Sequence, residues 1–350
     1  MKKRFFIVAF LCFLISTAQT KNVLYDIIDN TSSKRLENDI RKLADFGTRH
    51  TLSDTLSETR GIGAARRWIK SQFETISNEC FNCLEVFYQK NYFTPEDGDR
   101  IVKPVWINNV VAIQRGKTHP NRFIIMSGDI DSRISDPTNY KDDSPGANDN
   151  ASGMAGTIEA ARVLSNYTFE NSIVYVGLSG EEQGLYGGKG LAQYALDNNW
   201  EIIGVLNNDM IGNIEGIDGV IDNRSFRIFS EPFFFNSKYS TQLNMRTGGG
   251  ENDGDSRQLA RHVHKTVKKY MPELNPIMIY RLDRFGRGGH HRPFNEVGFP
   301  AVRIMETNEH YDRQHQDIRR EAGRDYGDVL VGVDFGYAAK VTGLNAVSLA

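Results

Sequence analysis

Cysteine is scarce in this chain, and the scarcity excludes two kinds of site. The 350 residues include three cysteines, Cys12, Cys80 and Cys83. A zinc knuckle would need a second cysteine pair, which is missing. A redox motif would need a strand–loop–helix context and a reactive thiolate. We therefore interpret Cys80 and Cys83, in the segment CFNC, as a local structural disulfide, which suits an oxidising compartment.

Long apolar runs are lacking beyond the first twenty residues. Residues 1–20 combine a positive start (MKKR), a short apolar stretch and small residues at the end. This pattern is typical of a secretory signal peptide, and the stretch is too short for a membrane span. We therefore expect residues 1–20 to be removed, the protein to be exported to the periplasm or secreted, and no membrane span to remain.

An excess of positive charge is also lacking. The formal net charge is −2, and removal of residues 1–20 leaves 39 basic and 44 acidic residues. This balance argues against a nucleic-acid partner. The chain is long enough to bury one large α/β core, so we predict a single domain over residues 21–350. The composition does not indicate an oligomeric partner.

Apolar, strand-like runs alternate with amphipathic helical segments. This alternation is typical of an α/β fold with a doubly wound, mostly parallel sheet and helices on both faces. Ligands bind such sheets at the carboxyl ends of the strands. The glycine- and asparagine-rich residues 213–256, with the aromatic segment EPFFFNSKY, are interpreted as a surface insertion. We expect strands at 83–89, 105–114, 122–128, 172–180, 201–212 and 300–306, and helices at 34–45, 57–76, 151–167, 184–199, 255–271 and 325–343.

Acidic residues recur where the predicted strands end. A single carboxylate in such a place usually caps a helix. Several carboxylates brought to one edge would repel one another and must pair, protonate or bind a cation. We therefore predict a divalent metal ion at this edge. The residues concerned are Asp129, Asp131, Asp149, Glu181, Glu182 and Asp209.

Histidines decide which metal this edge would favour. Carboxylates alone suit Mg²⁺, Ca²⁺ or Mn²⁺, whereas imidazole moves the preference toward Zn²⁺. The best candidates are the four histidines in loops that flank the strand at 300–306. They are His290, His291, His310 and His315.

Adjacent glutamates suggest the chemistry of this edge. Glu181 and Glu182 follow a buried strand, and neighbours on an extended backbone point in different directions. One can bind a metal while the other accepts a proton from a metal-bound water. This division of roles fits metal-assisted hydrolysis.

Five segments together resemble the co-catalytic zinc aminopeptidases of metallopeptidase family twenty-eight, a family that includes secreted bacterial leucyl-type enzymes. The segments are SPGANDNASGMAGTIEAAR, GLSGEEQGLYGG, NNDMIGN, GGHHRPFNEVGFPAVRIME and YDRQHQD, in this order. Glutaminyl cyclases and glutamate carboxypeptidases are relatives of the family. The resemblance implies a zinc pair with Asp149 as the bridging ligand, Glu181 as the general base, and Glu182, Asp209 and His315 as further ligands.

Two positions depart from the family pattern. Asp129 stands where the family usually has a histidine, and His290 stands where an aspartate is expected. In one interpretation Asp129 binds the metal through oxygen, so that Mn²⁺ or Co²⁺ could replace zinc. In a second, His290 compensates for Asp129. In a third, one site is lost and a single zinc remains. Repulsion between Asp129 and Asp131 would be relieved by the metal, with Arg133 as an outer partner.

The resemblance implies an exopeptidase that removes N-terminal residues from peptides. The expected substrate is a peptide with a free N-terminus, and the expected cofactor is two zinc ions, or one. Glutaminyl cyclisation is an alternative on the same fold, although the double glutamate in EEQG favours a hydrolase. A non-catalytic binding domain is a second alternative, but a retained base beside a ligand argues against it.

Overall fold

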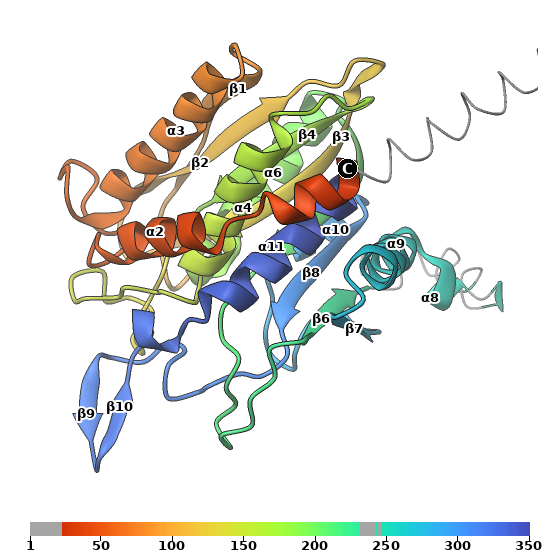
Figure 1. Cartoon of the computed structure of the whole chain (residues 1–350). Helices are drawn as coiled ribbons and strands as arrows, with labels where there is room; N and C mark the ends of the chain where they lie inside the picture. The colour runs from red at the N-terminus through yellow and green to blue at the C-terminus, as the bar shows by residue number, and fades with distance from the viewer. Residues whose placement is uncertain (1–22, 232–242, 244–246, 249) are drawn as a thin grey trace, which may run out of the picture.

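A computed structural model describes residues 23–231, 243, 247–248 and 250–350 (Figure 1). Its centre is an eight-stranded sheet in the order β1-β2-β4-β3-β5-β8-β6-β7. The neighbours β4, β3, β5 and β8 run parallel, whereas β1, β2 and β6 make antiparallel pairs. The predicted mostly parallel sheet is therefore confirmed. The strands are β1 (Leu84–Phe93), β2 (Val105–Gln114), β3 (His119–Asp129), β4 (Asn171–Leu178), β5 (Glu201–Asn208), β6 (Ser225–Ser230), β7 (Asn275–Ile279) and β8 (Ala301–Glu306).

Helices cover both faces of the sheet. Alternate residues of a strand point to opposite faces, and in β4 Tyr175 packs in the cluster that contains α4, whereas Val174 and Val176 pack with α6. The helices α2, α4 and α11 contact one another on the first face (Figure 1). The helices are α2 (Ser33–Ala44), α3 (Gly61–Glu79), α4 (Ala151–Leu164), α5 (Glu181–Gly184), α6 (Tyr186–Asp197), α8 (Gly250–Asp253), α9 (Asp255–Tyr270), α10 (His291–Glu296) and α11 (Phe335–Leu349). None of the helices in these ranges is long and apolar enough to cross a membrane.

The C-terminal helix was predicted too early, at 325–343. It begins at Phe335, where the side chain of Asp334 accepts a hydrogen bond of 2.7 Å from the backbone N–H of Tyr337. The preceding residues form the hairpin of β9 (Arg319–Glu321) and β10 (Arg324–Tyr326), which projects from the body of the molecule (Figure 1). The predicted helix at 184–199 corresponds to α6, which begins at Tyr186 because Leu185 adopts a left-handed φ of 63° between α5 and α6.

The segment 213–256 was interpreted as a surface insertion, and this interpretation is wrong for one part. Strand β6 lies within it and pairs with both β7 and β8. Phe226, Ile228 and Phe229 of β6 are fully buried. The segment therefore contributes a strand to the core. Most of the aromatic segment EPFFFNSKY lies outside the described residues.

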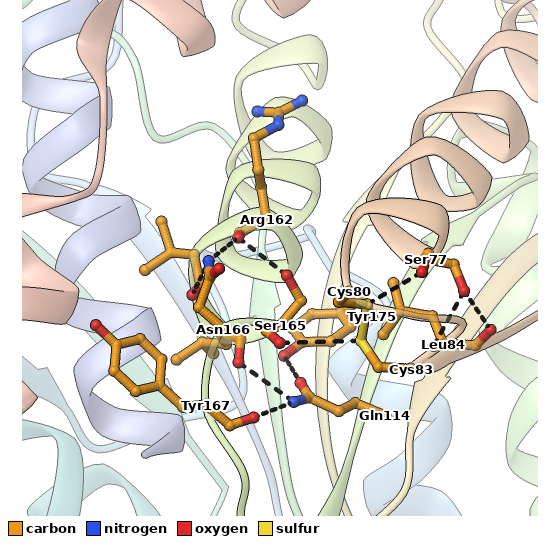
Figure 2. The surroundings of a disulfide bond; sticks show 12 residues. Ser77, Cys80, Cys83, Leu84, Gln114, Arg162, Ser165, Asn166, Tyr167 and Tyr175 are labelled. Carbon is orange, nitrogen blue, oxygen red and sulfur yellow. Dashed lines mark hydrogen bonds between the residues drawn. A yellow bond between two sulfur atoms is a disulfide. The ribbon is translucent and has the colours of Figure 1, made fainter.

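A disulfide joins Cys80 and Cys83 at the turn between α3 and β1, as predicted (Figure 2). The same turn is held by Ser77, whose hydroxyl donates to the carbonyl of Leu84 at 2.9 Å and accepts from its N–H at 3.2 Å. Sheet residues lie beneath it, where the hydroxyl of Tyr175 donates to Gln114 at 2.9 Å. The disulfide therefore closes a turn that hydrogen bonds already define.

A close approach between β3 and α4 fixes the place where the acidic residues gather. Gly128 is the last residue before Asp129, and a Cβ on Gly128 would lie 2.4 Å from the backbone carbon of Gly153 in α4. No L side chain can occupy that space without moving the helix or the strand. The helix that follows Asp149 is thus held against the strand that ends at Asp129.

We predict that Gly128→Ala lowers the free energy of unfolding by about 1–3 kcal/mol, the usual effect of overpacking a core. Urea denaturation followed by circular dichroism measures the change. Gly343→Ala in α11 is the matched control, because its new Cβ would meet its nearest neighbours at 3.6 Å, an ordinary contact. Equal unfolding midpoints for the two variants would contradict the close approach.

Candidate metal centre

The predicted acidic residues gather at the carboxyl edge of the central strands. Asp129 ends β3, Glu181 and Glu182 begin α5 shortly after β4, and Asp209 follows β5. Asp149 comes from the loop before α4. Because β3, β4 and β5 are parallel neighbours, their ends lie together.

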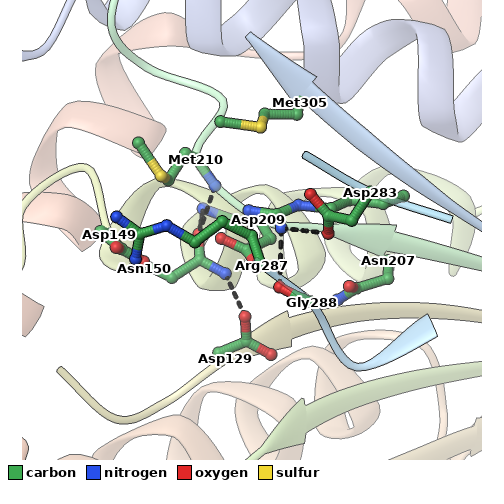
Figure 3. A network of polar contacts seen from close by, with 12 residues as sticks. Asp129, Asp149, Asn150, Asn207, Asp209, Met210, Asp283, Arg287, Gly288 and Met305 are labelled. Atoms are coloured by element: carbon green, nitrogen blue, oxygen red, sulfur yellow. Dashed lines mark hydrogen bonds and ion pairs between the residues drawn. The ribbon is translucent and has the colours of Figure 1, made fainter. Parts of the chain in front are cut away.

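Hydrogen bonds of the Asn150 side chain connect several of these chain segments (Figure 3). Its side-chain amide donates to Asp129 Oδ2 and to the carbonyl of Asn208, both at 2.8 Å. Its side-chain oxygen accepts from the backbone N–H of Gly153 at 3.0 Å and of Met210 at 3.1 Å. One buried amide thus connects β3, β5 and the start of α4.

Asp149, Glu182 and His315 form a set of metal-ligating atoms. One ligand atom from each lies within 4.8 Å of the other two. The Nε2 atom of His315 lies 2.9 Å from Asp149 Oδ2 and 3.0 Å from Glu182 Oε1. Two carboxylates and one imidazole suit zinc, and three protein ligands leave a fourth position for water or substrate. The residues therefore fit the metal that the sequence predicts.

Opposing effects act on the proton of His315. Burial lowers its pKa, but the negative charge of Glu182 and the hydrogen bonds to Asp149 and Glu182 outweigh burial and raise the pKa to about 9. The imidazole therefore sits between two carboxylates that favour a positive charge. A divalent ion would satisfy the same carboxylates.

Arg133 contacts two members of this set. Its Nε donates to Glu182 Oε2 at 2.7 Å, and its Nη2 lies 2.7 Å from His315 Nδ1. These contacts agree with the prediction that Arg133 is an outer partner of the metal site, since it contacts two of the three candidate ligands.

Asp131 faces a different set of partners from Asp129. It accepts hydrogen bonds from the backbone N–H of Glu181 at 3.2 Å, the N–H of Glu182 at 3.1 Å and the hydroxyl of Thr51 at 3.0 Å. Asp131 thus fixes the turn that presents the two glutamates. Repulsion between Asp129 and Asp131 is reduced because each carboxylate has its own donors.

Glu181 lines the cavity beside the three candidate ligands. Burial, followed by repulsion from Glu182 and Asp209, raises the pKa of Glu181 well above its usual value. Within the described ranges its carboxylate accepts no hydrogen bond. A carboxylate beside the candidate ligands, without a hydrogen-bond donor of its own, has the position of a general base.

Asp129 and Asp209 do not join the three ligands. Asp129 Oδ1 lies 2.5 Å from His290 Nδ1, and Asp209 Oδ2 lies 2.9 Å from Arg303 Nη2. The contact between Asp129 and His290 agrees with the predicted coupling of these two positions. Arg303, on β8, was not considered, although a lone arginine within the apolar run PAVRIME was a signal.

A cavity of about 880 Å³ opens over these residues and has a strongly charged lining. Its acidic side chains come mainly from the candidate metal centre. Its basic side chains are Arg100, Arg133, Lys189, Arg284, Arg287, Arg292 and Arg303. A cavity lined by both acidic and basic side chains suits polar ligands.

The chain belongs to peptidase family M28, whose family model matches residues 109–326. A "probable zinc metalloprotease" of the fungus Pyrenophora tritici-repentis is 38% identical over 330 residues, covering 93% of this chain and 76% of that protein. One from Leptosphaeria maculans is 41% identical over 324 residues, covering 92% and 74%. These relatives are fungal, whereas the resemblance in sequence pointed to secreted bacterial enzymes.

Solved structures share the fold at low identity. The Legionella pneumophila LapA aminopeptidase has a TM-score of 0.67 and 18% identity, covering 93% of this chain and 73% of that one. A Macrostomum lignano glutaminyl cyclase has a TM-score of 0.62 and 14% identity, covering 93% and 90%. The same fold thus occurs in proteins with both activities that the sequence suggested.

We predict that His315→Gln weakens zinc binding by more than about 100-fold, beyond the 10–100-fold loss typical of a residue that only supports a ligand. Competition with a chromogenic chelator, starting from metal-free protein, measures the affinity. His264→Gln in α9, away from the three ligands, is the control. Unchanged affinity in His315→Gln would remove His315 from the ligand set.

Proposed function

We propose that this protein is a zinc-dependent aminopeptidase that hydrolyses the N-terminal residue from peptides. The observation that carries the proposal is the position of Glu181, which lines the same cavity as the ligand set and directly precedes the ligand Glu182. Membership of a peptidase family and the aminopeptidases among the structural neighbours support it.

Zinc would be held by Asp149, Glu182 and His315. When bound there, zinc would supply a Lewis acid that polarises the scissile carbonyl and lowers the pKa of water. Mn²⁺ and Co²⁺ have overlapping ligand preferences, so we expect them to support partial activity. Arg133 would keep Glu182 and His315 in place, because it contacts both side chains.

Glu181 would take the proton of the attacking water and return it to the leaving amine. Its carboxylate lines the cavity and accepts no hydrogen bond within the described ranges, so it is placed to hold the proton between the two steps. Asp131 accepts from the N–H groups of both glutamates and so keeps the base beside the ligand. The reaction thus needs a defined backbone at the turn before α5.

The substrate would be a peptide with a free N-terminus. Carboxylates of the cavity lining, such as Asp149 and Glu181, attract an ammonium group. The basic residues of the same lining suit the carbonyl oxygens and carboxylates of a peptide. Residues 1–20 lie outside the described residues, and their composition supports the further proposal that the protein is exported. N-terminal sequencing of the protein from culture medium or periplasm tests export.

Glutaminyl cyclisation is the second candidate function, because glutaminyl cyclases share the fold. Cyclisation uses an amine of the substrate as nucleophile and consumes no water. Both reactions need a base for the proton of the nucleophile, so membership of a peptidase family is what favours hydrolysis. A binding domain without catalysis is the third candidate, and the presence of Glu181 beside the ligand set argues against it.

We predict that Glu181→Gln lowers kcat by about 10²–10⁴-fold, the usual contribution of a general base, and leaves zinc content unchanged. Release of 4-nitroaniline from a panel of aminoacyl-4-nitroanilides measures kcat. Glu296→Gln is the matched control, because Glu296 lines the same cavity but pairs with Arg292. Cyclisation of glutaminyl peptides without anilide release would support the second candidate instead.

We also predict that a chelator abolishes activity and that added zinc restores it, since no other described group could replace the metal's effect on water. Dialysis against dipicolinate, followed by titration with Zn²⁺, Mn²⁺ or Co²⁺, measures both effects. Addition of Mg²⁺ is the control, because a carboxylate–imidazole set binds it poorly. Full activity in metal-free protein would contradict the mechanism.

A further inference from the structure

We propose that the guanidinium of Arg303 occupies the second cation position of this centre, so that the chain binds one metal ion and not two. The inference rests on the proposed metal set of Asp149, Glu182 and His315. It departs from the zinc pair that the resemblance implies. It follows from the partners of the two carboxylates that would have held a second ion, Asp129 and Asp209.

Arg303 is a buried charge with fixed partners. Its side chain is 1% exposed. One terminal nitrogen lies 2.9 Å from Asp209 Oδ2, and the other lies 2.6 Å from Asp283 Oδ2 and donates to the carbonyl of Gly288 at 2.8 Å. A buried guanidinium is held in place by such pairs, because loss of one partner leaves an uncompensated charge. Its partners Asp209, Asp283 and Gly288 are labelled in Figure 3.

The pairing leaves Asp209 a poor ligand for a second ion. A divalent ion on Asp209 would lie next to the positive charge of Arg303, and like charges at short range repel strongly in a buried site. Release of Arg303 would not relieve the conflict, since the guanidinium would lose half of its charge compensation. Arg303 stays protonated under all ordinary conditions. The cation beside Asp209 is therefore permanent.

Asp129 is likewise occupied on both oxygens. Oδ1 lies 2.5 Å from His290 Nδ1, and Oδ2 accepts from Asn150 at 2.8 Å. His290 is fully buried, its Nδ1 contacts Asp129, and its Nε2 has no hydrogen-bond partner among the described residues; it is not part of the group that Asp149, Glu182 and His315 form. In the described part of the chain only Asp149, Glu182 and His315 form a metal-ligating group of three or more. A second ion bound by both Asp129 and Asp209 would have to displace His290, Asn150 and Arg303 together.

With Arg303 in place of a second metal ion, a positive charge remains next to the reacting centre. Arg303 lines the same cavity as Glu181 and Asp209. A preorganised cation at this edge favours the negative charge that develops on a carbonyl oxygen during hydrolysis. Arg303 would thus be a positioning residue for Asp209 and a fixed source of positive charge.

Metal counting tests the inference without a measurement of activity. Metal-free protein is loaded with Zn²⁺, dialysed, and analysed for zinc by mass spectrometry. We expect one zinc per chain in the wild type and in Asp129→Asn, and none in His315→Gln. Two zinc ions in the wild type, with one lost in Asp129→Asn, would overturn the inference.

A variant designed to bind a second zinc ion provides the second measurement. Arg303→Met combined with Asp129→His removes the guanidinium and supplies an imidazole, so we expect a second zinc to bind. Arg303→Lys is the matched control, because it keeps the charge and should keep one zinc. Melting curves establish that each variant is folded, and a folded double variant that still binds one zinc would count against Arg303 as the excluding group.

The outcomes separate this inference from the proposed function. One zinc per chain without peptide hydrolysis would overturn the aminopeptidase proposal and support the single-metal centre. Two zinc ions per chain together with peptide hydrolysis would support the aminopeptidase proposal and overturn the single-metal centre. Binding of no zinc by the folded wild type would overturn the ligand set and the inference with it.

Discussion

Repulsion among buried carboxylates is the constraint on which the site depends. Parallel strands and the loop before α4 bring Asp129, Asp149, Glu182 and Asp209 to one edge, where these carboxylates have little exposure to water. Each acidic side chain is matched by a donor or cation from a distant part of the chain. The pairs are Asp129 with His290, Asp149 with His315, Glu182 with Arg133 and Asp209 with Arg303.

The fold places these pairs through backbone contacts. Gly128 lets α4 approach β3, and Asn150 then joins the ends of β3 and β5. Asp328 holds the loop before α4, because its carboxylate accepts from the N–H of Asn148 at 2.8 Å and of Asp149 at 2.7 Å. The ligand atoms are therefore set by turns that depend on residues 328 and 150 as much as on the strands.

The sequence predicted the central strands and the acidic edge, because each depends on a short run of consecutive residues. Continuous apolar runs identify β3, β4 and β5, and acidic residues at their ends mark the site. The polar hairpin before α11 has no apolar period, so the helix boundary was misplaced. Strand β6 was not predicted, because it is short and follows a polar stretch. Arg303 was missed because its partners, Asp209 and Asp283, are distant in sequence and meet only in the fold.

Asp209 differs from Asp149 and Glu182 in how its negative charge is balanced. Asp209 is paired with a guanidinium that is covalently part of β8, so its partner cannot dissociate. Asp149 and Glu182 are held instead by an imidazole 2.9 and 3.0 Å away. A metal ion can replace the proton of an imidazole, whereas a guanidinium keeps its charge under all ordinary conditions. Asp149, Glu182 and His315 can therefore accept a metal ion in place of the proton on His315, and the pair of Asp209 and Arg303 keeps the ends of β5 and β8 together whether or not a metal is bound.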